Sequence, residues 1–254
     1  MRIAVCGKGG SGKSTIAALL ASEALHRGYR VLVVDGDESN AGLFQMLGFD
    51  DPPRPLLDFI GGREGLKKKM GEPNIFELAQ ITTADIPEKY ILSNNGLSLV
   101  AIGKIMHALE GCACPMGALN REFLKKLTLE EDEIAIVDLE AGVEHFGRGI
   151  ETGIDSILIV VEPPLESVNV GRRVHEMASD IGIRSIWAVL NKVPSEQIAA
   201  RLSDELQSRQ IAVAGSIHFN EQIFSASLEG VIPRERLEAV GKIFEVILPD
   251  KSKG

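Results

Sequence analysis

The sequence predicts an α/β protein, built as a three-layer sandwich around a mostly parallel sheet of about seven to eight strands. Short aliphatic runs recur along the chain, helical stretches separate them, and aromatic residues make up only 5% of the composition. The runs are continuous rather than alternating, which is typical of strands that are covered on both faces. Alternation of strand and helix favours parallel strands joined by right-handed crossovers.

Seven strands are predicted from the β-branched runs, and a helix is predicted between the first two because its apolar residues recur at helical spacing. Two further helices are expected, one of them an amphipathic helix docked near the end of the sequence. Three prolines mark a loop, and an irregular region is expected to continue to about residue 95. The strands are 2–6, 30–34, 97–102, 133–137, 156–161, 185–190 and 211–217, and the helices are 14–27, 119–127 and 237–248.

Length and composition restrict the classes of function. The 254 residues contain no internal repeat or linker, so a single domain over residues 1–254 is expected. A net charge of −9 disfavours non-specific binding to nucleic acid, and the aliphatic runs are too short to span a membrane. Three cysteines exclude a disulfide framework and indicate a reducing compartment. We therefore expect a cytoplasmic protein that binds neither nucleic acid nor membrane.

A glycine-rich segment after the first predicted strand gives the strongest functional signal. It fits the pattern G-x-x-x-x-G-K-[ST] and opens the first helix, so its backbone N–H groups can converge on phosphate oxygens. In this pattern Lys13 reaches the terminal phosphates and the Ser14 hydroxyl ligates Mg²⁺. The segment predicts a P-loop fold that binds ATP and Mg²⁺. The expected nucleotide-binding residues are Gly7, Lys8, Gly9, Gly10, Ser11, Gly12, Lys13, Ser14 and Thr15.

Acidic residues end two of the predicted strands, where ligands of open α/β sheets bind. Asp35 and Asp37 close the second strand and Asp138 closes the fourth. We expect Asp35 and Asp138 to hold Mg²⁺ directly or through water, and Asp37 to orient the attacking water. Glu38 and Glu140 fit better as carboxylates that cap loops.

Lys8 turns the loop into a Lys-Gly-Gly-x-Gly-Lys-Ser sequence, which resembles the deviant Walker A ATPases: MinD and ParA, the nitrogenase iron protein and the metallocluster-maturation ATPases. Residues 35–43 resemble the first switch of these proteins, and residues 138–142 resemble the second. Asn191, followed by Lys192, resembles their base-recognition motif. The resemblance implies that Asn191 contacts adenine and that ATP assembles a homodimer in which Lys8 reaches the partner's nucleotide.

A second lysine at the phosphates can assist catalysis. An added ammonium group at the phosphates neutralises charge that develops in the transition state. If a partner subunit supplies it, hydrolysis depends on dimerisation. The alternative for Lys8 is an ordinary exposed lysine of the loop, and the spacing alone does not show donation between subunits.

Cys112 and Cys114 are the predicted metal ligands. Thiolates at i and i+2 of an extended segment can bind one soft ion such as Ni²⁺ or Zn²⁺, and the flanking glycine and proline suggest an exposed loop before the helix at 119–127. A two-fold dimer would bring four thiolates together. Cys6 is expected to be a buried core residue, and His107 is expected to be structural.

A Cys-x-Cys pair in this region resembles the CooC type of nickel-insertion accessory ATPase, which implies carbon monoxide dehydrogenase as the client enzyme. Two alternatives remain open. One is an ATPase or reductase of the nitrogenase iron protein type that carries an iron–sulfur cluster. The other is a positioning ATPase similar to MinD or ParA, which would need a basic DNA-binding surface or a membrane-targeting tail; neither is evident in the sequence.

Overall fold

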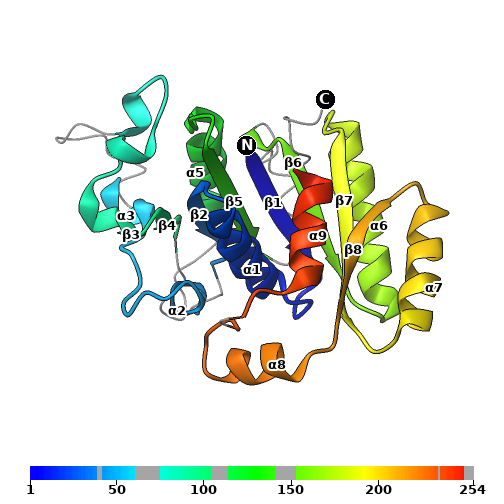
Figure 1. The fold of residues 1–254 in the computed structure, drawn as a ribbon. Helices are drawn as coiled ribbons and strands as arrows, with labels where there is room; N and C mark the ends of the chain where they lie inside the picture. Colours follow the sequence, from blue (N-terminus) through cyan, green and yellow to red (C-terminus); the bar gives the residue numbers. More distant parts are fainter. Residues whose placement is uncertain (39–41, 61–74, 104–113, 141–152, 234, 249–254) are drawn as a thin grey trace.

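The protein folds around one eight-stranded sheet, seen in a computed structural model that describes residues 1–38, 42–60, 75–103, 114–140, 153–233 and 235–248 (Figure 1). The strand order is β3-β4-β2-β5-β1-β6-β7-β8, and only β3 runs antiparallel to its neighbour. This confirms the predicted mostly parallel sheet. The strands are β1 (Arg2–Gly7), β2 (Arg30–Gly36), β3 (Ile91–Asn94), β4 (Leu97–Ala101), β5 (Glu133–Leu139), β6 (Ser156–Val161), β7 (Ser185–Val193) and β8 (Ala212–His218).

Helices cover both faces of the sheet and complete the three layers. In Figure 1, α1 and α9 lie on the near face, and α5 and α6 lie on the far face together with α7 at the β8 end. The helices are α1 (Lys13–His26), α2 (Leu43–Met46), α3 (Leu56–Phe59), α5 (Cys114–Lys126), α6 (Leu165–Asp180), α7 (Glu196–Gln207), α8 (Glu221–Leu228) and α9 (Glu238–Ile247), with 3₁₀ turns at Ile75–Glu77, Thr83–Asp85 and Glu88–Tyr90. None of the helices in the described ranges is both long and apolar enough to cross a membrane.

The central strands are buried on both sides because their residues alternate between two apolar layers. Ile3 and Val5 of β1 pack toward α1 and α9, whereas Ala4 and Cys6 pack toward α5 and α6. Each large aliphatic side chain buried in this way contributes about 1.5–3 kcal/mol to folding. This two-sided burial explains the continuous aliphatic runs in the sequence.

Three elements differ from the sequence-based expectation. The region before residue 95 is not irregular throughout, since β3 pairs with β4 through a turn in which Asn95 and Gly96 have φ of 47° and 85°. An Asn-Gly pair is the preferred sequence for such a two-residue hairpin. Helix α5 begins at Cys114 rather than at residue 119, because Pro115 is compatible with a first helical turn. Strand β7 continues to Val193, so Asn191 lies within it.

Helix α9 docks against α1, as predicted. Its apolar face is buried, and Arg27 at the end of α1 donates to the Gly241 carbonyl oxygen at 3.1 Å and to Glu245 at 2.9 Å. The buried carboxylate of Glu23 in α1 accepts hydrogen bonds of 2.6 Å from Arg27 and 2.6 Å from Arg236, which lies just before α9. Burial acts to raise the pKa of Glu23, but the hydrogen bonds from Arg236 and Arg27 outweigh it and hold the pKa below its ordinary value. Arg27 also lies 5.2 Å from the centroid of the Phe244 ring.

Candidate functional site

The predicted phosphate loop connects β1 to α1 at the carboxyl edge of the sheet (Figure 1). Gly12 precedes α1 with φ of 94°, and a Cβ atom at this position would lie 2.5 Å from Asn191 Nδ2. Gly7 has φ of 144°, and a Cβ atom there would lie 2.5 Å from the Val160 carbonyl oxygen. Glycine is therefore required at both positions by conformation and by space. Gly12, the residue before α1, has no side chain to cap the first N–H groups of the helix, and N–H groups at a helix start are typical binding groups for anions.

Ser14 and Asp138 are in contact at this edge. The Ser14 hydroxyl donates a 2.5 Å hydrogen bond to Asp138 Oδ2, and β2 pairs with β5 so that Asp35 lies opposite Asp138. Burial raises the pKa of Asp138 to about 7; the Ser14 hydrogen bond and Lys13 oppose this shift, and the charges of Asp35 and Asp37 add to it. The three predicted carboxylates and Lys13 therefore share one electrostatic environment. Their catalytic and metal-binding roles remain predictions.

The residues around Asp138 fit a magnesium ion that is also held by phosphate and water. Mg²⁺ prefers oxygen ligands, and Ser14 and Asp138 supply a hydroxyl and a carboxylate. Asp138 Oδ1 is buried and has no hydrogen-bond partner among the described residues. Over the same residues, no group of three or more histidine, cysteine, aspartate or glutamate side chains is arranged to hold a metal ion.

Asn191 and Lys192 brace the phosphate loop from β7. Asn191 is buried, and its Nδ2 donates a 2.8 Å hydrogen bond to the Ser11 carbonyl oxygen. Lys192 Nζ donates to the Gly10 carbonyl oxygen, and its backbone has φ of 56°, which is uncommon for a residue with a side chain. The contact of Asn191 with adenine remains a prediction, and the bracing role of Lys192 has no signal in the sequence beyond its position next to Asn191.

Lys8 is held by two carboxylates that the sequence analysis did not identify. Its Nζ lies 3.0 Å from Glu166 Oε2 and 3.9 Å from Glu162 Oε1. The hydrogen bond to Glu166 raises the pKa of Lys8, against a smaller opposing effect of desolvation. The lysine is therefore ionised and paired within its own subunit.

The structure describes two of the three cysteines, Cys6 and Cys114. Cys6 is buried with its Sγ 3.8 Å from the Leu158 carbonyl oxygen, and burial raises the pKa of its thiol to about 12, which confirms that it is a core residue. Cys112 and His107 lie outside the described residues. Cys114 is the first residue of α5, so it begins a helix and does not lie in the predicted loop. Residues 39–41 and 141–142 of the two predicted switches also lie outside the described residues.

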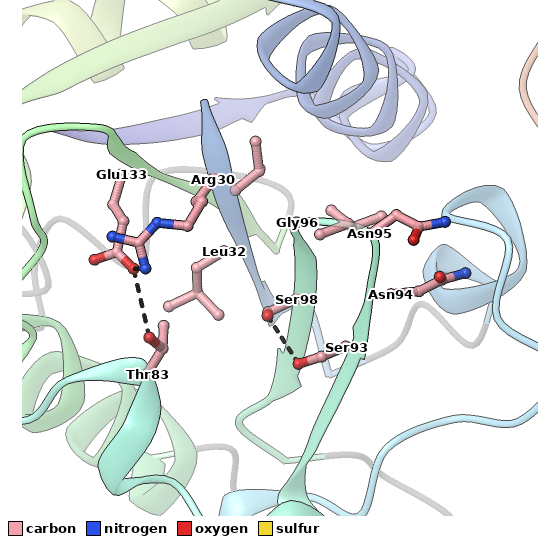
Figure 2. Close-up of a pocket in the computed structure, with 11 residues that line it drawn as sticks. Arg30, Leu32, Thr83, Ser93, Asn94, Asn95, Gly96, Ser98 and Glu133 are labelled. Atoms are coloured by element: carbon pink, nitrogen blue, oxygen red, sulfur yellow. Dashed lines mark hydrogen bonds and ion pairs between the residues drawn. The ribbon is translucent and has the colours of Figure 1, made fainter. Parts of the chain in front are cut away.

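A hollow of about 250 Å³ lies at the opposite, amino edge of the sheet (Figure 2). Its charged groups and hydroxyls are paired with one another. Arg30 lies 2.8 Å from Glu133, the Thr83 hydroxyl donates to Glu133 at 3.5 Å, and the hydroxyls of Ser93 and Ser98 are 2.9 Å apart. The Arg30–Glu133 pair joins β2 to β5, and the Ser93–Ser98 pair joins β3 to β4. Both charged residues that line the hollow are therefore already paired.

The fold and the loop define a P-loop nucleotide-binding protein of the α/β class. The family described as the CobQ/CobB/MinD/ParA nucleotide binding domain matches residues 3–233, and the chain belongs to this family. The resemblance to deviant Walker A ATPases is thereby confirmed, and the protein is an ATPase of the MinD/ParA type.

Individual relatives agree with this assignment. The chain is 40% identical over 253 residues to an uncharacterized ATP-binding protein of Methanocaldococcus jannaschii, covering 97% of this chain and 99% of the relative. It is 34% identical to the carbon monoxide dehydrogenase accessory protein CooC of Rhodospirillum rubrum, covering 91% and 88%. The crystal structure of the cell division ATPase MinD of Pyrococcus furiosus superposes with a TM-score of 0.71 at 22% identity, covering 97% of both chains.

Proposed function

We propose that this protein is a Mg²⁺-dependent ATPase that dimerises, binds a soft metal ion between its subunits through Cys112 and Cys114, and assists nickel insertion into carbon monoxide dehydrogenase. The similarity to CooC and the Cys-x-Cys sequence support the client and the cargo. We place the protein in the cytoplasm, where ATP is available and thiols stay reduced. Its acidic composition gives it no evident partner among nucleic acids or membranes.

One structural observation carries the link between nucleotide and metal. Helix α5 begins at Cys114 after the carboxyl end of β4, at the same edge of the sheet as the phosphate loop. A Cβ atom at Gly36, between Asp35 and Asp37, would lie 2.7 Å from Asn120 Nδ2 of α5. The strand end that carries the catalytic aspartate thus packs directly on the helix that begins with a predicted metal ligand. A movement of one requires an adjustment of the other.

Each group in the phosphate site has a defined task in this proposal. The loop N–H groups and Lys13 bind the phosphates, and Asp37 orients the attacking water. Lys8 of a second subunit neutralises charge on the phosphates as the bond to the leaving oxygen breaks. A bound Mg²⁺, held by Ser14 and Asp138 together with phosphate oxygens, adds further positive charge at the same place.

The metal ion is a cargo in this mechanism. Two thiolates from each subunit make a four-thiolate site that suits tetrahedral Zn²⁺ or square-planar Ni²⁺. Metal and ATP both favour the dimer, so each should strengthen the binding of the other by the same factor. When hydrolysis weakens the dimer, the four-thiolate site separates and the ion is released to the client enzyme.

Metal titration of the purified protein tests the cargo and its ligands. The proposal predicts saturation with Ni²⁺ or Zn²⁺ near one ion per two chains, and loss of this binding in Cys112→Ala/Cys114→Ala with ATP hydrolysis retained. Cys6→Ala is the matched control, because Cys6 is buried in β1 and should not affect the stoichiometry. Saturation at one ion per monomer, or unchanged binding in the double variant, would contradict the proposal. Iron and acid-labile sulfide in the dimer would instead favour a cluster carrier of the nitrogenase iron protein type.

A further inference from the structure

The ion pair between Lys8 and Glu166 connects the phosphate loop to α6. Lys8 Nζ lies 3.0 Å from Glu166 Oε2, and the Lys8 side chain is 28% exposed while that of Glu166 is 73% exposed. Lys8 therefore lies at the surface of the loop, and its ammonium group points to a carboxylate of its own subunit.

The carboxylates at this position are held in place by the backbone. Glu162 directly follows β6, and its N–H donates a 3.1 Å hydrogen bond to the hydroxyl of Ser167 in α6. This bond fixes the connection between β6 and the first turn of α6, where Glu166 lies. Glu166 thus faces Lys8 from a helical turn that is hydrogen-bonded to the end of β6.

Glu162 contacts Lys192 as well as Lys8, so its role differs from that of Glu166. Its carboxylate lies 3.6 Å from Lys192 Nζ and 3.9 Å from Lys8 Nζ, and Lys192 also donates to the Gly10 carbonyl oxygen. Glu162 therefore helps to brace the loop. Within the part of the chain that the structure describes, Glu166 forms an ion pair with Lys8 alone.

We propose that Glu166 is a positioning residue that retains Lys8 within its own subunit and so opposes its transfer to the nucleotide of a second copy. This inference rests on the proposed role of Lys8 between subunits. One ammonium group cannot pair with Glu166 and with the partner's phosphates at once, so the two anions compete for it. A triphosphate carries more charge than one exposed carboxylate and prevails once the dimer is formed. Glu166 thereby raises the protein concentration that is needed for activity.

The Glu166→Gln variant tests this role because it removes the charge and keeps the shape. An exposed ion pair typically changes an equilibrium by about two- to fivefold, so the protein concentration at half-maximal ATPase activity should fall by about two- to fivefold. The kcat at saturating protein and the affinity of the monomer for ADP should not change. Glu176→Gln is the matched control, since Glu176 forms an exposed ion pair with Arg172 on the same helix and should leave the concentration dependence unchanged.

Lys8→Ala and the double variant Lys8→Ala/Glu166→Gln distinguish the role of Glu166 from that of Lys8. In a Lys8→Ala background, Glu166→Gln should have no effect on ATP-dependent dimerisation measured by light scattering. If Lys8→Ala is inactive but Glu166→Gln leaves the half-activity concentration unchanged or raises it, the positioning role is wrong and the role of Lys8 stands. If Lys8→Ala keeps full activity, the proposed function of Lys8 fails and the positioning role fails with it.

Discussion

The Ser14 hydroxyl lies 2.5 Å from Asp138 Oδ2 and joins the first turn of α1 to the end of β5. The sequence predicts both residues as Mg²⁺ ligands. They are 124 positions apart in the chain, and the fold brings them into contact. Asp138 is fully buried, and its pKa is raised to about 7 by that burial. The protein thus keeps a carboxylate in an environment that opposes its ionisation.

The pH dependence of stability follows from this raised pKa. The unfolded carboxyl group ionises near 3.8, so between about pH 4 and 7 the folded protein binds more protons and its stability falls as pH rises. Asp138→Asn should therefore increase the free energy of unfolding of the nucleotide-free, metal-free protein by roughly 1–4 kcal/mol at pH 8, and by much less at pH 5. Urea denaturation at the two pH values measures the difference.

Asp155 provides a control because its pKa is lowered, whereas that of Asp138 is raised. Burial acts to raise the pKa of Asp155, but the hydrogen bonds from Arg2 outweigh burial, so the pKa is lower than its ordinary value. Its contribution to stability is present above the ordinary pKa of the carboxyl group and is lost as the pH falls through the lowered value. Asp155→Asn should thus destabilise the protein at pH 8. Stabilisation by Asp155→Asn, or destabilisation by Asp138→Asn, would contradict the assigned environments.

Lys13 should be required for nucleotide binding. It is buried at the start of α1, and its ammonium group is the closest expected partner of the terminal phosphates. Lys13→Ala should weaken ATP binding by about 10- to 100-fold, because a hydrogen bond to a charged group is lost. Isothermal titration with Mg-ATP measures the effect. Lys242→Ala removes an exposed lysine of α9 and should bind ATP like the wild type; an equal loss in both variants would contradict a specific role for Lys13.

Gly12 should not tolerate a side chain. An added Cβ would lie 2.5 Å from Asn191 Nδ2. Gly12→Ala should therefore break the hydrogen bond from Asn191 to the Ser11 carbonyl oxygen and abolish ATP binding. Gly10→Ala is the matched variant, because Gly10 also has a positive φ of 79° but no atom within 4 Å of the added Cβ. Gly10→Ala should lose only about 1 kcal/mol of stability from backbone strain. Melting temperatures and ATP titrations that do not distinguish the two variants would show that Asn191 does not constrain the loop.

Asp37 should affect turnover and not binding. It is buried directly after β2, and the proposed mechanism uses it to orient the attacking water. Asp37→Asn should bind Mg-ATP with the wild-type affinity and hydrolyse it about 10²- to 10⁴-fold more slowly. Single-turnover measurements separate the two steps. Loss of ATP binding in Asp37→Asn would contradict this role and show that Asp37 is needed to bind the nucleotide.

The sequence predicted the sheet and the phosphate loop because both depend on local patterns. Continuous β-branched runs mark two-sided burial, and the glycines of the loop are required by positive φ and by the close approach of Asn191 and Val160. The hairpin of β3 and β4 was missed although its Asn-Gly turn is a local signal. The start of α5 differs from the prediction because a proline after a cysteine fits both the end of a loop and the first turn of a helix, and the structure has the helix.

The neighbours of Lys8 could not be predicted in the same way. Glu162 follows β6 and Glu166 lies in the first turn of α6, both more than 150 positions from Lys8, and the sequence around them has no distinctive pattern. Their contact with Lys8 depends on β6 lying next to β1 in the sheet. Such contacts follow from strand order, which periodicity does not determine.

The proposed action of Lys8 on the nucleotide of a second subunit can be tested by mixing Lys8→Ala chains with Asp37→Asn chains, each of which is defective in hydrolysis by itself. A heterodimer of Lys8→Ala and Asp37→Asn chains has one site with an intact Asp37 and the partner's intact Lys8. A random equimolar mixture should therefore recover about one quarter of the wild-type ATPase activity, since half of the dimers are mixed and each has one working site. Activity no higher than the sum of the separate variants, with heterodimers demonstrated by native mass spectrometry, would show that Lys8 does not act across the interface.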